Sequence, residues 1–165
     1  MEPDTRWRCK TDVRCLTAGF AVLAIAAASC GSAPSKPATG VYLGSVGRPG
    51  CTPSATFTGG QPEAGFDSTK GSVWALFFHS VPPPAGQDIK VVWRMTGSGD
   101  FRIAARDAAG TASKLVFGPE PHEGSSWNTH PGAEVGTGFN FAHAGCWDLN
   151  IARTDTRADL WLAVI

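Results

Sequence analysis

Apolar residues from Val41 onward come in short runs separated by clusters of Gly, Pro, Asp or Ser, without a helical period. Short runs of this kind are typical of β-strands, and the residues between them favour turns. The pattern therefore predicts an all-β domain over 41–165, with strands at 41–46, 55–58, 72–79, 89–96, 101–106, 113–117, 138–142, 146–153 and 159–164.

Alternation along these runs predicts which side chains share a face of the sheet. Val91, Trp93 and Met95 recur at every second position, so they point to one side of their strand. The Gly97–Asp100 tetrapeptide after them is typical of a tight turn and predicts a hairpin with the next run. A second hairpin is predicted for the last two runs, joined through 154–157.

About seven to nine antiparallel strands in roughly 125 residues favour a β-sandwich, with a closed barrel as the alternative. Strands do not alternate with helical segments, so a nucleotide-binding α/β fold is not expected.

The first 29 residues have the composition of a signal peptide. Basic residues (Arg6, Arg8, Lys10 and Arg14) precede an uncharged stretch at 15–29. That stretch is shorter than the roughly 20 apolar residues of a membrane-spanning helix, but it suits the apolar region of a signal peptide. We therefore expect a signal-peptide helix at 1–29, with an uncleaved anchor or a buried helix as the alternative.

Two cleavage sites compete at the end of this leader. Ala26–Ala28 fits the A-x-A pattern of ordinary secretion. Ala27–Ser32 resembles the lipobox of bacterial lipoproteins, with small residues before Cys30 and Gly-Ser after it, although Ala27 stands where that family usually has Leu. The resemblance implies a lipid such as palmitate on Cys30 and a location on the outer face of the cell membrane. Secretion without lipid is the alternative.

Residues 32–40 are rich in Ser, Pro, Ala and Thr, a composition typical of a flexible linker. The expected organisation is a signal peptide at 1–29, a lipidated Cys and linker at 30–40, and a β-sandwich domain at 41–165.

Besides Cys30, only Cys51 and Cys146 remain after removal of the leader. Two thiols in one small exported domain predict a disulfide, and two free thiols are the alternative. The residues Trp147, Leu149 and Ile151 share one face of their strand, which places Cys146 on the other face. If the apolar face is the core, the disulfide lies outside the sheet, and Cys51 belongs to a segment that crosses its outside or edge.

The tripeptide Gly145-Cys146-Trp147, with Gly138-Phe139 before it and an apolar hairpin after it, resembles a group of bacterial exported domains that end in a Gly-Cys-Trp strand. Cys51-Thr52-Pro53 and Val92–Met95 also fit that group. The resemblance implies an immunoglobulin-like β-sandwich in a lipoprotein or secreted setting. It implies no particular activity.

The longest irregular stretch, 118–137, is the candidate site, because long loops without secondary structure are often functional. His122, Trp127, Asn128 and His130 are its candidate ligand-facing residues, and a loop Trp beside an Asn can stack on a ligand and hydrogen-bond to it. Nearby carboxylates (Glu120, Glu123 and Glu134) make a metal-handling or metal-sensing domain the alternative function. The spacing matches no known ligand motif, so no metal site and no cofactor is predicted.

The other tryptophans and histidines are predicted to have structural positions, in the core, on the outer face of a sheet or in turns. Trp74, Trp93 and Trp147 are expected in the core, whereas Trp161 faces away from Leu160 and Leu162. If it is exposed, Trp161 offers a platform for sugar rings; otherwise the N-terminal segment covers it. His79 and His143 are expected as solvated turn residues.

Composition and motifs narrow the function. The chain beyond the leader is close to electrically neutral, which argues against nucleic acid as a partner. GxSxG, HExxH and a phosphate-binding loop after a strand are all absent, so an enzyme is not expected. The sequence favours an extracytoplasmic binding or structural interaction module, anchored to the membrane by lipid, with a protein or a cell-wall polysaccharide as partner.

Overall fold

A computed structural model describes residues 40–122 and 129–165. Internal contacts divide the chain into Met1–Ser35 and Lys36–Ile165, and the described residues belong to the second unit. The predicted signal peptide, the lipidation site at Cys30 and the linker up to residue 39 lie outside the described residues, as do Glu123, Trp127 and Asn128.

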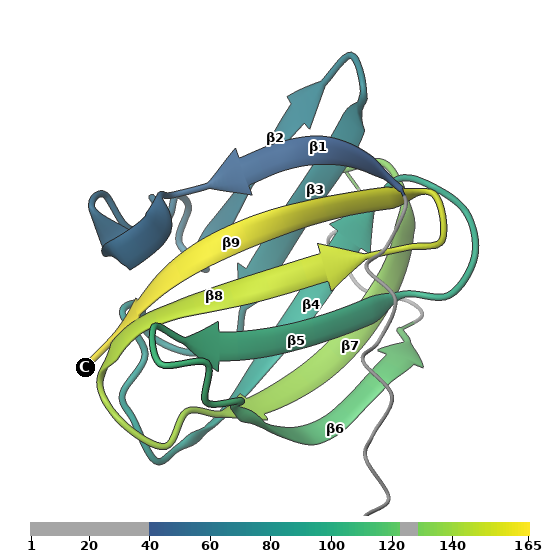
Figure 1. The fold of residues 1–165 in the computed structure, drawn as a ribbon. Helices are drawn as coiled ribbons and strands as arrows, with labels where there is room; N and C mark the ends of the chain where they lie inside the picture. The colour runs from purple at the N-terminus through teal and green to yellow at the C-terminus, as the bar shows by residue number, and fades with distance from the viewer. Residues whose placement is uncertain (1–39, 123–128) are drawn as a thin grey trace, which may run out of the picture. The chain divides into compact units, whose positions relative to one another are not determined.

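Nine strands form two sheets that pack face to face (Figure 1). The four-stranded sheet has the order β1-β9-β8-β5, and the five-stranded sheet has the order β2-β3-β4-β7-β6. A short 3-10 helix, η1 (Pro49–Cys51), follows β1. The strands are β1 (Val41–Val46), β2 (Glu63–Ser68), β3 (Gly71–Phe77), β4 (Asp88–Met95), β5 (Arg102–Asp107), β6 (Lys114–Pro121), β7 (Ala133–Asn140), β8 (Gly145–Ala152) and β9 (Thr156–Val164).

The connectivity is that of an immunoglobulin-like β-sandwich, as predicted. Strands β4, β7 and β6 adjoin one another in one sheet, and β9, β8 and β5 adjoin in the other. Taken in chain order from β4 to β9, these are the positions of strands B-E-D and G-F-C in immunoglobulin domains. In addition, β1 pairs in parallel with β9 at the edge of the four-stranded sheet.

Large apolar side chains from both sheets fill the space between them. Trp93 and Trp147 are completely buried there, as their alternation predicted. The Trp93 indole N–H donates to the Thr137 hydroxyl at 2.8 Å, and that hydroxyl donates to the Val91 carbonyl at 3.3 Å. The Thr137 hydroxyl and the Trp93 indole are therefore both satisfied, as most buried polar groups are, whereas the buried Ser72 hydroxyl has no hydrogen-bond partner among the described residues.

One of the two predicted hairpins is wrong. The turn after β4 carries the chain from the five-stranded sheet to the four-stranded sheet, so β4 and β5 do not pair. The turn forms hydrogen bonds with the β8–β9 turn instead: the Thr154 N–H donates to the Ser98 carbonyl at 3.0 Å, and Ser98 donates to Asp155. The other predicted hairpin, β8–β9, is confirmed.

Further corrections concern strands and one tryptophan. Strand β2 was not predicted, and the predicted strand 55–58 contributes only an isolated bridge between Thr58 and Glu63. Much of the stretch 118–137, predicted to be irregular, belongs to β6 and β7. Trp74 lies on the outer face of its sheet, where it packs against Leu76 and Val92 rather than in the main core.

The described chain begins next to the β8–β9 turn. The Val41 N–H donates to the Asp155 carbonyl at 2.6 Å, and β1 then runs along β9. Within residues 40–122 and 129–165, no helix is long and apolar enough to cross a membrane.

Candidate functional site

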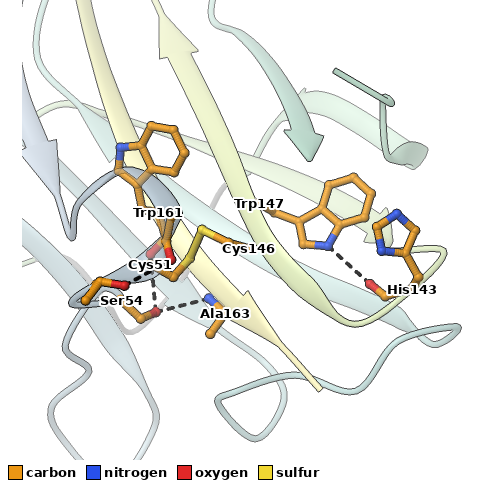
Figure 2. Close-up of a disulfide and its surroundings, with 9 residues drawn as sticks. Cys51, Ser54, His143, Cys146, Trp147, Trp161 and Ala163 are labelled. Carbon is orange, nitrogen blue, oxygen red and sulfur yellow. Dashed lines mark hydrogen bonds between the residues drawn. A yellow bond between two sulfur atoms is a disulfide. The ribbon is translucent and has the colours of Figure 1, made fainter. Parts of the chain in front are cut away.

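The disulfide between Cys51 and Cys146 joins η1 to β8 across 95 residues, with the two Cα atoms 5.5 Å apart. Trp147, Leu149 and Ile151 are buried in the core, whereas Cys146 lies on the opposite face of β8. Figure 2 shows the sulfur of Cys146 and the indole of Trp147 leaving the strand in opposite directions. The predicted disulfide and its position outside the sheet are both confirmed.

Hydrogen bonds hold the segment after the disulfide against strand β9 (Figure 2). The Ser54 hydroxyl accepts from the Ala163 N–H at 3.0 Å and donates to the Trp161 carbonyl at 3.4 Å. The Ala55 N–H also donates to the Trp161 carbonyl, at 2.8 Å. Trp161 faces away from the core, as predicted, and is partly buried, so it is not the open platform considered for sugar rings.

A pocket of about 450 Å³ lies where the β4–β5 turn meets the facing parts of β6 and β7. A pocket of this volume suits a small ligand. Both flanks of the predicted ligand-facing stretch line it, together with the turn and the residue after β8: Gly99, Asp100, Phe101, Pro119, Glu120, Pro121, Ala133, Glu134, Val135 and Arg153. The stretch 118–137 thus borders a cavity, although His122 and His130 do not line it.

Arg153 is the unusual member of this lining because its residue is only 7 % exposed. Its guanidinium donates to the carbonyls of Met95 at 3.1 Å, Gly99 at 2.9 Å and Ala133 at 3.4 Å, and it lies over the Phe101 ring. Burial lowers the pKa of Arg153, and the charge of Asp155 acts in the opposite direction. The described residues provide no carboxylate in a salt bridge with this guanidinium.

Three other hollows are of similar size, with volumes of about 370, 510 and 380 Å³. Their described lining residues include no buried charged side chain: Arg48, which borders one of them, is exposed, and His79, which borders another, is half-buried. Since buried charge is costly and is retained where it has a partner or a role, Arg153 distinguishes the pocket at the β6–β7 end.

His122 belongs to a polar network on the outer face of the five-stranded sheet. Its Nδ1 lies 2.5 Å from one oxygen of Glu134, and the other oxygen of that carboxylate accepts from Arg94 at 2.9 Å. The Glu134 side chain is only 6 % exposed. The Nζ of Lys90 lies 3.4 Å from the Nε2 of His122. These contacts tie β4, the end of β6 and β7 together.

His130 lies on the same outer face but contacts a different carboxylate. Its ring stacks on Trp74 with 3.8 Å between centroids, and its Nε2 lies 3.5 Å from Glu63. Arg94 also donates to the His130 carbonyl at 3.0 Å, which links this pair to the network around Glu134. Two predicted candidates are therefore joined through Arg94, while Trp127 and Asn128 lie outside the described residues.

The alternative of a metal centre gains no support from this geometry. Among the residues that the structure describes, no three His, Cys, Asp or Glu side chains are grouped so that they could hold a metal ion. His143 is exposed next to a turn, as predicted, whereas His79 is half-buried and its ring nitrogens contact Ser80 and Gln87. Hydrogen bonds with the Ala144 carbonyl and the Asp107 carboxylate raise the pKa of His143.

Sequence reasoning missed two residues that the structure makes conspicuous. Arg153 continues the alternating phase of Trp147, Leu149 and Ile151, so a charged residue in a core-facing position was the available signal. Asp148 lies on the opposite face, beside Cys146, and one of its carboxylate oxygens is buried without a hydrogen-bond partner. Burial, together with the charge of Asp159, raises the pKa of Asp148 to about 6.

Comparison with known proteins identifies no family. No family model matches the chain, and no curated protein does. Among solved structures, the Lin-41 filamin domain is 10% identical, with a TM-score of 0.41 over 55% of this chain and 91% of that one. A structure titled "Putative Lipoprotein from Bacillus anthracis" is 18% identical, with a TM-score of 0.39 over 61% and 83%. Both scores are below 0.5, so the assignment of the fold rests on the strand order of this chain.

Proposed function

We propose that this protein is an exported binding module, held on the outer face of a membrane by lipid on Cys30, that takes a ligand in the pocket at the β6–β7 end. The observation that carries the proposal is the pocket itself, which combines a suitable volume with a buried guanidinium. Apolar walls with a few convergent polar groups are the usual features of a ligand site.

The disulfide supports the export part of the proposal. Disulfides persist in oxidising compartments and are rare in the cytosol of most organisms. The Cys51–Cys146 bridge lies outside the core, where reductants would reach it more easily than a core-centred bridge. An oxidised bridge at this position fits a protein that works outside the cytoplasm.

The path of the chain supports a pocket that lies near the lipid surface. Val41 is hydrogen-bonded to the β8–β9 turn, and that turn carries Arg153 and binds the Ser98–Asp100 turn beside the pocket. About ten residues separate Cys30 from this point, a reach of at most about 35 Å. A lipid on Cys30 would therefore tether the domain by the end that contains the pocket.

Labelling with a radioactive or clickable palmitate analogue tests the anchor. The wild-type protein is expected to incorporate the label and to sediment with membranes, because two or more acyl chains anchor stably. Cys30→Ala is expected to lose both properties, and Ser32→Ala is the matched control that keeps them. Equal labelling of wild type and Cys30→Ala would refute lipidation. Retention of Met1 in the protein isolated from membranes would refute it as well.

Ligand screening by NMR tests the binding site. We expect amides and side chains around Asp100, Glu120 and Arg153 to shift when a ligand is added, while those around the Cys51–Cys146 bridge stay unchanged. Cell-wall saccharide fragments and peptides are the first compounds to screen. Ligands that shift only signals far from this pocket would contradict the proposed site.

A further inference from the structure

The guanidinium of Arg153 has hydrogen-bonding capacity that the described residues leave unused. Arginine has five N–H donors, one on Nε and two on each terminal nitrogen. The three carbonyl bonds to Met95, Gly99 and Ala133 use one N–H on each nitrogen. One N–H on each terminal nitrogen remains for a further acceptor, and a carboxylate is the acceptor that an arginine can bind through two N–H groups at once.

Within the part of the chain that the structure describes, no carboxylate forms a salt bridge with this guanidinium. Asp155 influences it electrostatically, but the Asp155 carboxylate accepts two hydrogen bonds from Ser98, both 2.8 Å long. Asp100 and Glu120 line the same pocket, yet both are exposed, and neither forms a salt bridge with Arg153. Three carbonyls explain how Arg153 is held in place, but they do not neutralise a buried positive charge.

The other pocket residues indicate what accompanies the carboxylate of the ligand. Pro119 and Pro121 give one wall apolar surface, against which the C–H face of a sugar ring can pack. Asp100 and Glu120 are acceptors that suit hydroxyl groups, and their negative charge disfavours a ligand that carries several anionic groups. A hydroxylated ring that carries a single carboxylate matches these features together: the ring packs on the prolines, its hydroxyl groups donate to the two acidic residues, and its carboxylate accepts from Arg153.

We propose that this pocket binds an acidic sugar, with Arg153 as the residue that receives the carboxylate and with Asp100 and Glu120 as acceptors for its hydroxyl groups. This inference rests on the proposed function, because it names the ligand class of the same pocket. It fits a partner that is a saccharide rather than a protein segment.

The test compares D-galacturonic acid with its methyl ester, in which a neutral methoxycarbonyl group replaces the carboxylate, and each probe is added to the exported mature protein. The acid is expected to bind at least about tenfold more tightly than the ester, because a charge-assisted bidentate pair is lost in the ester. NMR of the wild-type protein is expected to show the Arg153 guanidinium signals shifting with the acid alone. Equal affinity for acid and ester, or guanidinium signals unmoved by bound acid, would overturn the inference.

Variants sharpen the test. Arg153→Lys keeps the positive charge but loses the planar set of N–H donors of the guanidinium. Binding of the acid is therefore expected to weaken about tenfold, while binding of the ester changes little. Because this variant can also loosen the fold, Glu120→Gln is the second variant. It removes a repulsive charge, keeps an acceptor oxygen and leaves an exposed site, so the acid is expected to bind at least as tightly as to wild type. Weaker binding of the acid to Glu120→Gln would contradict the assignment.

The outcomes distinguish a failure of the acidic-sugar assignment from a failure of the proposed binding site. If neutral sugars or amino acids bind in the pocket as well as the acid does, the acidic-sugar assignment is wrong and the binding site stands. If a partner binds on another face and saccharides, acids and amino acids all leave the pocket signals unchanged, the proposed binding site is wrong as well.

Discussion

The outer faces of the two sheets are stabilised in different ways. On the four-stranded sheet, the Cys51–Cys146 bridge fastens η1 to β8, and next to it Asp148 is half-buried with an unpartnered oxygen. On the five-stranded sheet, the described residues form no disulfide, and the nearly buried Glu134 is paired with both Arg94 and His122.

The comparison contrasts a face held by a covalent link with a face held by ion pairs, and the two differ in whether a buried carboxylate has partners. Where a disulfide holds the segments together, an unfavourable buried carboxylate is tolerated. Where charged side chains hold the strands together, each carboxylate needs partners, because a buried charge without one is strongly destabilising. The predictions below test whether the two faces really depend on these different interactions.

The largest effect is expected from removal of the disulfide. Replacing both Cys51 and Cys146 by Ala should lower the free energy of unfolding by about 4 kcal/mol, because the bridge closes a loop of 95 residues in the unfolded chain. Denaturation in guanidinium chloride measures the loss. A reductant should destabilise the wild type similarly and leave the double variant unchanged; a loss below about 1 kcal/mol would show that the bridge is not the main support of this face.

A smaller loss is expected on the opposite sheet. Glu134→Gln removes the carboxylate that pairs with Arg94 and His122, and we expect unfolding to require about 2 to 3 kcal/mol less free energy. Glu120→Gln, at an exposed position, is the matched control and should change stability by less than about 0.5 kcal/mol. Equal effects of the two substitutions would show that the network contributes little to this face.

The smallest effect is expected at Asp148, and it has the opposite sign. Its pKa of about 6 in the folded protein lies above the ordinary value, so between about pH 4 and pH 6 the folded state holds a proton that the unfolded chain has lost. This residue therefore makes stability fall as the pH rises through that window. Asp148→Asn should stabilise the protein by about 1 kcal/mol at pH 7, with solvent screening taken into account, and by little at pH 4.

Thermal or chemical unfolding of Asp148→Asn at the two pH values measures this effect, with Asp100→Asn at an exposed position as the control. A variant that is less stable than wild type at pH 7, or one whose stability depends on pH as that of wild type does, would show that the ionised Asp148 carboxylate does not destabilise the folded protein.

The sequence was sufficient to predict the features that depend on strict alternation. Trp147, Leu149 and Ile151 identified the core side of β8, and the outward position of Cys146 followed from it. Strand β3 was located correctly, but apolar residues occupy both of its faces, so alternation did not reveal that Trp74 points outward. There the hydrophobic pattern is continuous because both faces are covered.

Other features depend on contacts between distant residues, which no local pattern encodes. The Gly97–Asp100 turn looks like a hairpin turn, but its hydrogen bonds with Thr154 and Asp155 guide the chain across to the other sheet. Strand β2 contains Gly65 and Asp67, which weaken its strand signal, although Gly65 lies where the Val73 carbonyl and Trp74 leave no room for a side chain. In the candidate site, the stretch 118–137 was predicted as an irregular ligand-facing loop; its two ends belong to β6 and β7 and border a pocket, and the buried Arg153 of that pocket comes from the β8–β9 turn.

The position of the disulfide directly after β1 also sets how the domain responds to mechanical force. A pull on the chain at Gly40 would break the hydrogen bonds between β1 and β9 one after another, beginning with the bond between Val41 and Asp155. Peeling would stop at Cys51, which is covalently joined to β8, after about 11 residues or roughly 35 to 40 Å of extension. While the bridge is oxidised, only β1 and η1 can be pulled out. Further force acts through the disulfide on β8, which lies in the interior of its sheet.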